Sequence, residues 1–183
     1  MIKRSEYREA AKRAAELLKK TGITILPGEL ENQLEVADFG LSEIWISGAQ
    51  ILTLVNTERL AVKLLVMLPY QTEPEHTHKE IEDYPGKEET VRCEWGTLYM
   101  YSPGDPTPNP KGQPPAHRRE TYTVWHETIM HPGDQLTFAP NTPHWFQGGP
   151  EGAVIWSFST KVVDAKDVFT DPSIIRETVI LED

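Results

Sequence analysis

From residue 43 onward the sequence is a succession of short apolar runs separated by turn residues. The runs are rich in β-branched and aromatic residues, and they read IWIS, QILTLVN, RLAVKLLVML, TVRCEW, TLYMYS, TYTVWHETIM, QLTFAP, HWFQ and AVIWSFS. They predict roughly nine short strands, with no long helical pattern between them. This indicates an antiparallel sandwich or barrel, and closure is favoured because it removes exposed edges. We expect turns at Trp95-Gly96 and at 132–134.

The N-terminal segment has a different pattern. Residues 5–21 carry apolar side chains at helical spacing, namely Tyr7, Ala10, Ala11, Ala14, Leu17 and Leu18. This spacing predicts an amphipathic helix with Ser5 as its N-cap and Gly22 just past its end. Its Lys and Arg side chains lie on the other face, where we expect them to be solvated.

The length of 183 residues suits one domain with a substantial core. We expect a single domain over 1–183 that consists of an N-terminal helical extension (1–33), a β-barrel (34–160) and a C-terminal tail (161–183). Residues 103–119 carry six prolines and no core pattern, which indicates a stiff polar loop. Such a loop suits a lid or a dimer contact, or is simply a surface excursion.

Charge and cysteine content exclude several classes of function. The net charge of −10 repels polyanions, so we expect no nucleic-acid partner. Cys93 is the single cysteine and cannot form an internal disulfide, which favours the reducing cytoplasm. The chain shows no secretory signal pattern and no apolar run near the ~20 residues of a membrane span, so we expect no membrane association.

Three histidines form the candidate metal site. His76 and His78 stand two residues apart at the predicted start of a strand, so both side chains point to the same face. His144 follows a Pro-Gly turn, a short strand and a second proline in PGDQLTFAPNTPHWFQ. The combined spacing resembles the two motifs of the cupin barrels. The resemblance implies an all-β fold, a jelly-roll-like double-stranded β-helix barrel. Tyr70 replaces a glycine expected in that pattern, without removing a ligand.

The fourth ligand is a carboxylate, and the cupin pattern offers two candidates. Glu82 has the usual three-residue separation from His78, but it precedes the turn DYPG. Glu89 opens the next predicted strand, and six residues separate it from Gly96, as the motif requires. We therefore favour Glu89. The remaining acidic residues of the segment are expected to be solvated loop charges; these are Glu75, Glu80, Glu82 and Asp83.

Three imidazoles and a carboxylate suit a borderline or hard divalent ion. Mn²⁺, Fe²⁺, Co²⁺, Ni²⁺ and Zn²⁺ all fit this donor set. Four protein ligands on a six-coordinate ion leave two positions open for substrate. A metal-dependent enzyme is therefore the leading expectation.

A narrower resemblance follows from several separate motifs. These are GKEETVRCEWGTLYMY, the proline-rich loop, YTVWHE, PNTPHWFQGGPEGAV and DVFTDP. From residue 34 to 176 the chain resembles the cupin-type D-lyxose isomerases. The resemblance implies a Mn²⁺-dependent aldose-ketose isomerase that interconverts D-lyxose with D-xylulose and D-mannose with D-fructose, commonly as a homodimer. It implies the ligand set His76, His78, Glu89 and His144.

Lys87 matches an active-site lysine of that family. The isomerisation passes through an enediolate with negative charge on two adjacent oxygens, which a metal and the Lys87 ammonium would offset. For the base the candidates are Asp171 and Glu127, with His126 as a further option. Arg176 and Trp145 are the expected sugar contacts. The indole could instead belong to the core, as could Trp125, Phe146 and Cys93.

Two other functions are compatible with the same residues. An Fe²⁺-dependent cupin dioxygenase would share the ligands, and a non-catalytic cupin would bind a sugar without turnover. Metal identity and oxygen uptake separate the first from an isomerase. Sugar binding without isomerisation would favour the second.

Overall fold

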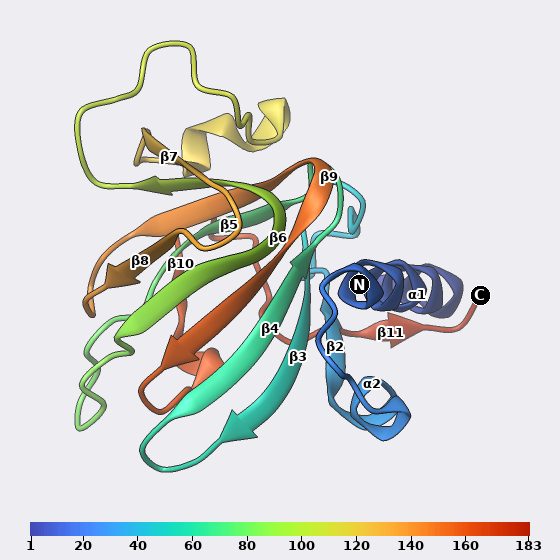
Figure 1. The fold of residues 1–183 in the computed structure, drawn as a ribbon. Coiled ribbons are helices and arrows are strands. Elements are labelled where there is room, and N and C mark those ends of the chain that lie inside the picture. The colour runs from blue at the N-terminus through green and yellow to red at the C-terminus, as the bar shows by residue number, and fades with distance from the viewer.

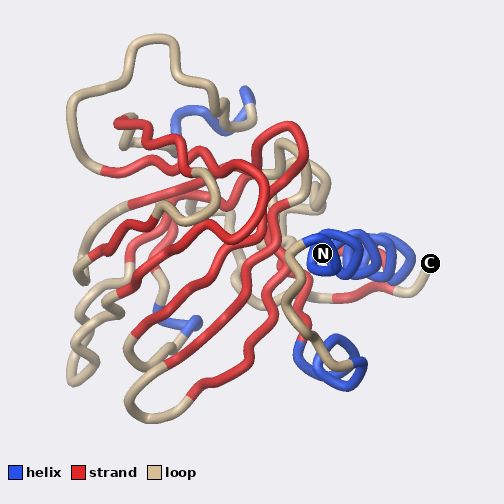
Figure 2. The backbone as a smooth tube through the Cα atoms, in the orientation of Figure 1, coloured by secondary structure: helices blue, strands red, loops and turns tan.

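One strongly curled sheet of nine strands dominates the computed structural model, which describes residues 1–183 (Figures 1 and 2). The helices are α1 (Arg4–Lys20) and α2 (Pro27–Gln33), with the 3-10 turns η1 (Ala116–Thr121) and η2 (Asp164–Lys166). The strands are β1 (Ile2–Lys3), β2 (Leu34–Ala37), β3 (Ala49–Asn56), β4 (Ala61–Met67), β5 (Thr72–Thr77), β6 (Glu89–Ser102), β7 (His126–Met130), β8 (Gln135–Phe138), β9 (His144–Ser159), β10 (Val168–Phe169) and β11 (Ile180–Leu181). The expected all-β cupin barrel with an N-terminal α-helix is confirmed.

The two longest strands, β6 and β9, curl the sheet into a barrel. They pair antiparallel along most of their length, while β9 also pairs with β5 near its start and with β4 near its end. Each apparent pair of runs, TVRCEW with TLYMYS and HWFQ with AVIWSFS, is therefore one bent strand. The first half of TYTVWHETIM is not strand, since β7 begins only at His126.

The expected turn at Trp95-Gly96 is wrong, because β6 continues through it. The pairing of β6 with β9 is irregular on both sides of this dipeptide. Gly96 has φ +78°, and a Cβ there would lie 2.2 Å from the carbonyl oxygen of Gly152 on β9. The glycine therefore allows two bending strands to approach closely, which from sequence alone resembles a turn signal.

Alternation along the strands builds two apolar layers. Leu65 and Met67 of β4 face the barrel interior, whereas Leu64 and Val66 face outward toward α1. The helix contributes Ala14, Leu17 and Leu18 to that outer layer. The expected helix is thus confirmed, although it begins at Arg4 with Lys3 at the N-cap position. Its Ser5 hydroxyl instead donates to the Asp183 carboxylate.

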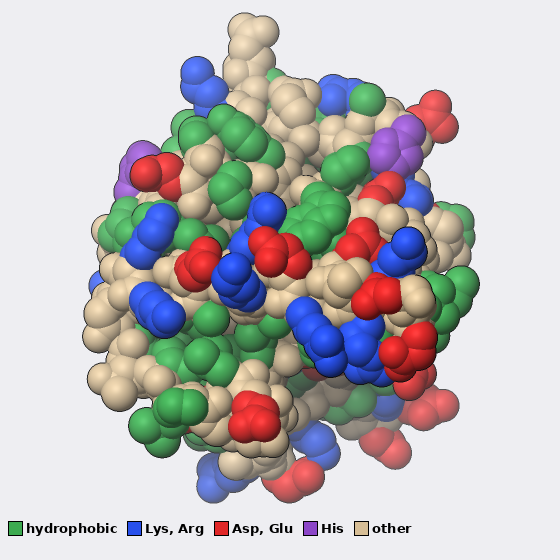
Figure 3. All heavy atoms as spheres, turned by 90° about the vertical axis from the view of Figure 1, so that its right-hand side faces the viewer, with side chains coloured by type: hydrophobic (Ala, Val, Ile, Leu, Met, Phe, Trp, Pro, Cys, Tyr) green, Lys and Arg blue, Asp and Glu red, His purple; other side chains and the backbone are tan.

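The C-terminal tail crosses one mouth of the barrel and ends beside the N-terminus. Phe169 and Ile174 pack against the interior cluster, and the Ile175 N–H donates to the Phe39 carbonyl at 2.9 Å. Strand β11 then pairs in parallel with β1. On the face that carries these termini, Lys and Arg side chains intermingle with Asp and Glu (Figure 3). The tail also adds β10 to the sheet beside β5.

The proline-rich segment lies as a loop at the other side of the sheet (Figure 1). It covers an aromatic cluster of Tyr101, Tyr122 and Trp145, and the Tyr101 hydroxyl donates to the Gly112 carbonyl at 2.8 Å. No helix of the structure has the length and apolar character needed to cross a membrane.

Candidate metal centre

The three predicted histidines meet inside the barrel. His76 lies near the end of β5 and His78 directly follows that strand, while His144 opens β9 directly opposite His76. Each side chain is buried, and one ring nitrogen from each lies within 4.8 Å of the other two. The antiparallel pairing of β5 with β9 therefore brings together residues that are far apart in sequence, and the cluster can hold a metal ion.

Hydrogen bonds fix the orientation of all three rings. The Nδ1 atoms of His76 and His144 lie 2.9 Å and 3.0 Å from the carbonyl oxygens of Pro74 and Thr142. A carbonyl only accepts, so each Nδ1 carries the proton and each Nε2 keeps its lone pair. The Nδ1 of His78 donates to the Asp167 carboxylate at 2.6 Å. These contacts are the outer hydrogen bonds that orient metal-binding imidazoles.

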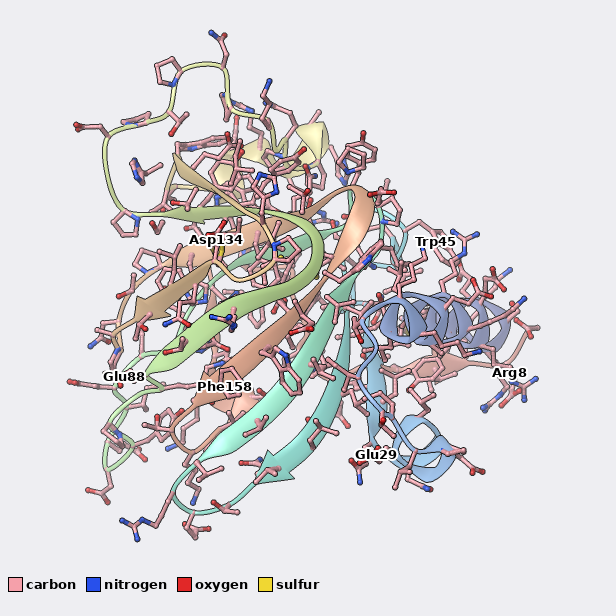
Figure 4. All side chains as sticks on the ribbon, viewed as in Figure 1. Arg8, Glu29, Trp45, Glu88, Asp134 and Phe158 are labelled. Carbon is pink, nitrogen blue, oxygen red and sulfur yellow. The ribbon has the colours of Figure 1, made fainter.

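Strand alternation brings Glu89 to the histidines. Lys87 and Glu89 are buried while the intervening Glu88 is exposed and points away from the barrel (Figure 4). Glu89 Oε2 lies 3.1 Å from His78 Nε2 and 3.8 Å from His144 Nε2. The same oxygen lies 3.1 Å from the Lys87 Nζ.

Glu82 lies away from this group. It is exposed and has φ +53° in the tight turn where Ile81 and Tyr84 exchange backbone hydrogen bonds. The carboxylate that the structure brings to the histidines is therefore that of Glu89.

The donor atoms fit a divalent cation. The Nε2 of His144 is fully buried and has no hydrogen-bond partner. Burial, followed by the neighbouring imidazoles, lowers the pKa of His144 to about 4 and that of His76 well below its usual range. Both rings are therefore neutral, as metal ligation requires.

Glu89 stays ionised despite its burial. Burial alone would raise the pKa of its carboxyl, but Lys87 and His78 outweigh this effect and hold the pKa well below its ordinary value. Burial and Lys87 lower the pKa of His78, yet Asp167 and Glu89 outweigh them and raise it. His78 and Glu89, which would both hold the cation, contact each other directly at 3.1 Å.

A cavity of about 30 Å³ lies next to the cluster. Its charged and polar lining residues are Lys63, Glu73, His76, His78, Lys87, Glu89, Ser157, Asp164, Asp167 and Arg176. Two lining cations are engaged by carboxylates: Lys63 contacts Asp164 at 2.9 Å, and Arg176 contacts Glu35 at 2.5 Å. The tail residues Asp164, Asp167 and Arg176 form the part of the lining that lies over the barrel mouth.

Of the predicted catalytic and sugar-contacting residues, Lys87 and Arg176 line the cavity and two others do not. Trp145 is fully buried in the aromatic cluster, stacked on Tyr101 at a centroid distance of 3.7 Å. Asp171 accepts hydrogen bonds from Ser173 and pairs with Arg118 at 2.8 Å.

The alternative base candidates also lie outside the cavity lining. Glu127 accepts hydrogen bonds from the backbone N–H groups of Lys111 and Gly112 in the proline-rich loop. His126 is exposed at the start of β7. Neither side chain therefore faces the histidine cluster.

Sequence reasoning missed several residues of this site. Asp167 lies in the tail, 89 residues from the His78 ring that it orients, and no motif spacing links them. Glu73 lines the cavity although regular alternation places it on the other face of β5. The expectation that Glu75 is a solvated loop charge is wrong, because it is 2% exposed and accepts hydrogen bonds from Thr123 and Thr170.

Comparisons with known proteins find sugar isomerases. No family model matches the sequence. The chain is 47% identical over 176 residues to the D-lyxose ketol-isomerase of a Thermofilum species, covering 96% of this chain and 97% of the relative. It is 48% identical over 176 residues to the D-lyxose/D-mannose isomerase of Thermosediminibacter oceani, with the same two coverages. The L-ribose isomerase of Acinetobacter sp. DL28 shares the fold, with a TM-score of 0.80 at 17% identity and 98% coverage of both chains.

Proposed function

This chain belongs to the D-lyxose ketol-isomerase family, and we propose that it interconverts D-lyxose with D-xylulose and D-mannose with D-fructose. The observation that carries the proposal is that three histidines meet Glu89 and Lys87 beside a small cavity. An aldose-ketose isomerisation needs positive charge beside two adjacent sugar oxygens and a route for one proton. This group of side chains supplies both.

The metal would be held by His76, His78, His144 and Glu89. Three imidazoles and a single carboxylate suit Mn²⁺, Fe²⁺, Co²⁺, Ni²⁺ or Zn²⁺, and the family resemblance favours Mn²⁺ among them. When bound, such a cation offsets the negative charge that develops on the two sugar oxygens.

Lys87 supplies a second positive charge. Burial lowers the pKa of its ammonium, but Glu89 and Asp167 outweigh burial and raise the pKa overall, so the group stays protonated. Its Nζ can donate hydrogen bonds to sugar oxygens bound beside Glu89. The Lys87 Nζ lies 3.1 Å from Glu89 Oε2, so its N–H donors are held beside the ligand carboxylate, where they can reach a sugar oxygen.

We assign Asp171 and Trp145 different tasks from those expected from the sequence. Asp171 connects the tail to Arg118, so it supports the tail over the barrel mouth. Trp145 donates from Nε1 to the Val124 carbonyl at 2.8 Å and supports the aromatic cluster. Arg176 keeps its proposed place as a sugar contact, because it lines the cavity.

Sugar entry requires the cavity to widen. A cavity of about 30 Å³ holds on the order of two water molecules. Small-molecule sites commonly measure roughly 300–1,000 Å³, so a monosaccharide needs more room. We further propose that the protein is cytoplasmic, which the free thiol of the buried Cys93 supports. We also propose that it is a homodimer, which the family resemblance supports.

A metal analysis joined to a sugar assay tests the function. We expect one divalent ion per chain and the formation of D-xylulose from D-lyxose and of D-fructose from D-mannose. Oxygen consumption should remain at background, in contrast to a dioxygenase. Metal-replete protein that binds these sugars but forms no ketose would contradict the proposal and favour a non-catalytic sugar-binding protein.

A further inference from the structure

An irregularity in β5 turns Glu73 toward the cavity. Glu73 pairs with Phe146 of β9, and His76 pairs with His144, so three steps along β5 match two steps along β9. The extra residue is a β-bulge. Without it, alternation would place Glu73 and His76 on opposite faces. Pro74, which lacks an N–H, lies within the bulge, a position that tolerates proline.

The carboxyl of Glu73 has no partner in the protein. The residue is 8% exposed, and its Oε2 atom is fully buried without a hydrogen bond. The cavity cations that could neutralise it are engaged elsewhere, since Lys87 pairs with Glu89 and Arg176 pairs with Glu35. Buried polar groups without partners are rare in proteins and lower stability, so we expect the Glu73 carboxyl to find its partner in a bound ligand.

The neutral form of this carboxyl is the favoured one. Burial, followed by the negative charge of Glu89, raises the pKa of Glu73 to about 8. A protonated carboxyl offers one O–H donor and one carbonyl acceptor side by side. A sugar presents hydroxyl groups that both donate and accept, so the two chemistries are complementary.

We propose that the unpartnered carboxyl of Glu73 contacts the bound sugar and forms a hydrogen bond with one of its hydroxyl groups. The inference rests on the proposed sugar-isomerase function and adds a specificity-determining residue to it. Because Glu73 and His76 line the same cavity, this contact orients the sugar relative to the histidine cluster. A site with a buried polar group that hydrogen-bonds a substrate hydroxyl discriminates strongly against analogues that lack that hydroxyl.

If Glu73 binds the sugar, its substitution should affect sugar binding without lowering the stability of the protein. Replacing Glu73 with leucine removes a buried polar group that has no partner, so the sugar-free protein should keep or raise its melting temperature. Replacing it with glutamine preserves a neutral donor and acceptor of similar shape. A residue needed only for folding would behave differently, since its loss would lower the melting temperature.

The test compares Glu73→Gln and Glu73→Leu with the exposed control Glu88→Gln. Binding is measured calorimetrically with D-arabinitol, the alditol of D-lyxose, which has no carbonyl and cannot isomerise. Glu73→Leu should weaken alditol binding and lower kcat/KM by about tenfold or more, the effect of one lost hydrogen bond to a ligand. Glu73→Gln and Glu88→Gln should stay within about threefold of the unmodified protein. Metal content should stay at one ion per chain in all variants.

Several results would overturn the inference. These are unchanged alditol affinity in Glu73→Leu, a Glu73→Gln protein as impaired as Glu73→Leu, a melting temperature of Glu73→Leu several degrees lower, or no alditol binding by the unmodified protein. The second result would instead indicate an ionised carboxylate. If the unmodified protein formed no ketose from any aldose, the proposed function would fail, while the alditol affinities would still decide the role of Glu73.

Discussion

Glu73 and Glu75 lie two residues apart on β5, are both buried, and have opposite surroundings. Glu75 faces away from the cavity and accepts hydrogen bonds from the Thr123 N–H and hydroxyl, the Val124 N–H and the Thr170 hydroxyl, at 2.6–3.1 Å. Glu73 faces the cavity, and its buried Oε2 accepts none. Burial is therefore a poor guide to the role of a carboxylate, whereas its partners are a good one.

The same contrast separates the two sides of β5 more generally. On the outer side, Glu75 connects β5 to the segment before β7 and to the tail, which is a structural task. On the cavity side, the Nε2 of His144 and the Oε2 of Glu73 lack partners, which suits ligands that are not part of the chain. Substitutions on the cavity side should therefore change binding and activity, and those on the outer side should change stability.

The largest effect is expected from the ligand carboxylate on the cavity side. In Glu89→Gln the shape is kept and the charge is lost, so bound metal should fall toward zero and isomerisation to background. Glu82→Gln is the matched control and should retain both. Metal content per chain and ketose formation are the measurements. Equal loss in the two variants, or loss only in Glu82→Gln, would transfer the ligand role away from Glu89.

The next effect concerns the outer side. Glu75→Ala leaves the Thr123 and Val124 N–H groups without their acceptor. A hydrogen bond to a charged group contributes about 1.5–3 kcal/mol, so the loss of these contacts should lower the free energy of unfolding by roughly 3–4 kcal/mol. Denaturant unfolding measures it, with the exposed Glu80→Ala as a control expected within about 0.5 kcal/mol of the unmodified protein. An unchanged midpoint for Glu75→Ala would remove the distinction between the two sides.

The third prediction concerns Glu73 on the cavity side and is tested by measuring the stability of the metal-free protein as a function of pH. The pKa of Glu73 is raised to about 8 in the folded protein, so the native state binds more protons than the unfolded state above the ordinary value of 4.5. Its contribution to stability is therefore lost as pH rises. Relative to Glu73→Gln, the unmodified protein should lose about 2 kcal/mol of unfolding free energy between about pH 5.5 and 7. Parallel pH profiles of the two proteins would show that Glu73 is already ionised.

The smallest effect is expected from the residue that orients a cavity-side ligand. In Asp167→Asn the amide oxygen can still accept from His78 Nδ1, but the negative charge is lost. Metal affinity should fall by about tenfold, the lower end of the effect of such outer hydrogen bonds. Competition with a chelator of known affinity measures it. A hundredfold or greater loss would place Asp167 among the ligands themselves.

The sequence alone predicts the structural elements whose side chains repeat at the regular spacing of a strand or a helix. The alternating apolar runs predict the barrel, and the spacing of Ala10, Ala14 and Leu17 predicts the helix that packs on it. The pairing of His76 with His144 follows from the motif that the chain shares with cupins.

Features that interrupt a period were not predictable. The bulge in β5 reverses the side to which Glu73 points, and a single sequence carries no signal for it beyond Pro74. Asp167 reaches His78 only because the tail folds over the barrel mouth. Gly96 looked like a turn because close strand approach and turns both favour glycine.

The central claim is that the histidine cluster and Glu89 hold a divalent ion that the isomerisation requires. Its most direct test is to strip the protein with a chelator, add Mn²⁺ in steps, and follow bound metal and D-xylulose formation from D-lyxose in the same samples. We expect no activity in the stripped protein and a rise in proportion to bound metal that levels off at one ion per chain. Activity that persists after stripping, or full metal occupancy without D-xylulose, would contradict the account.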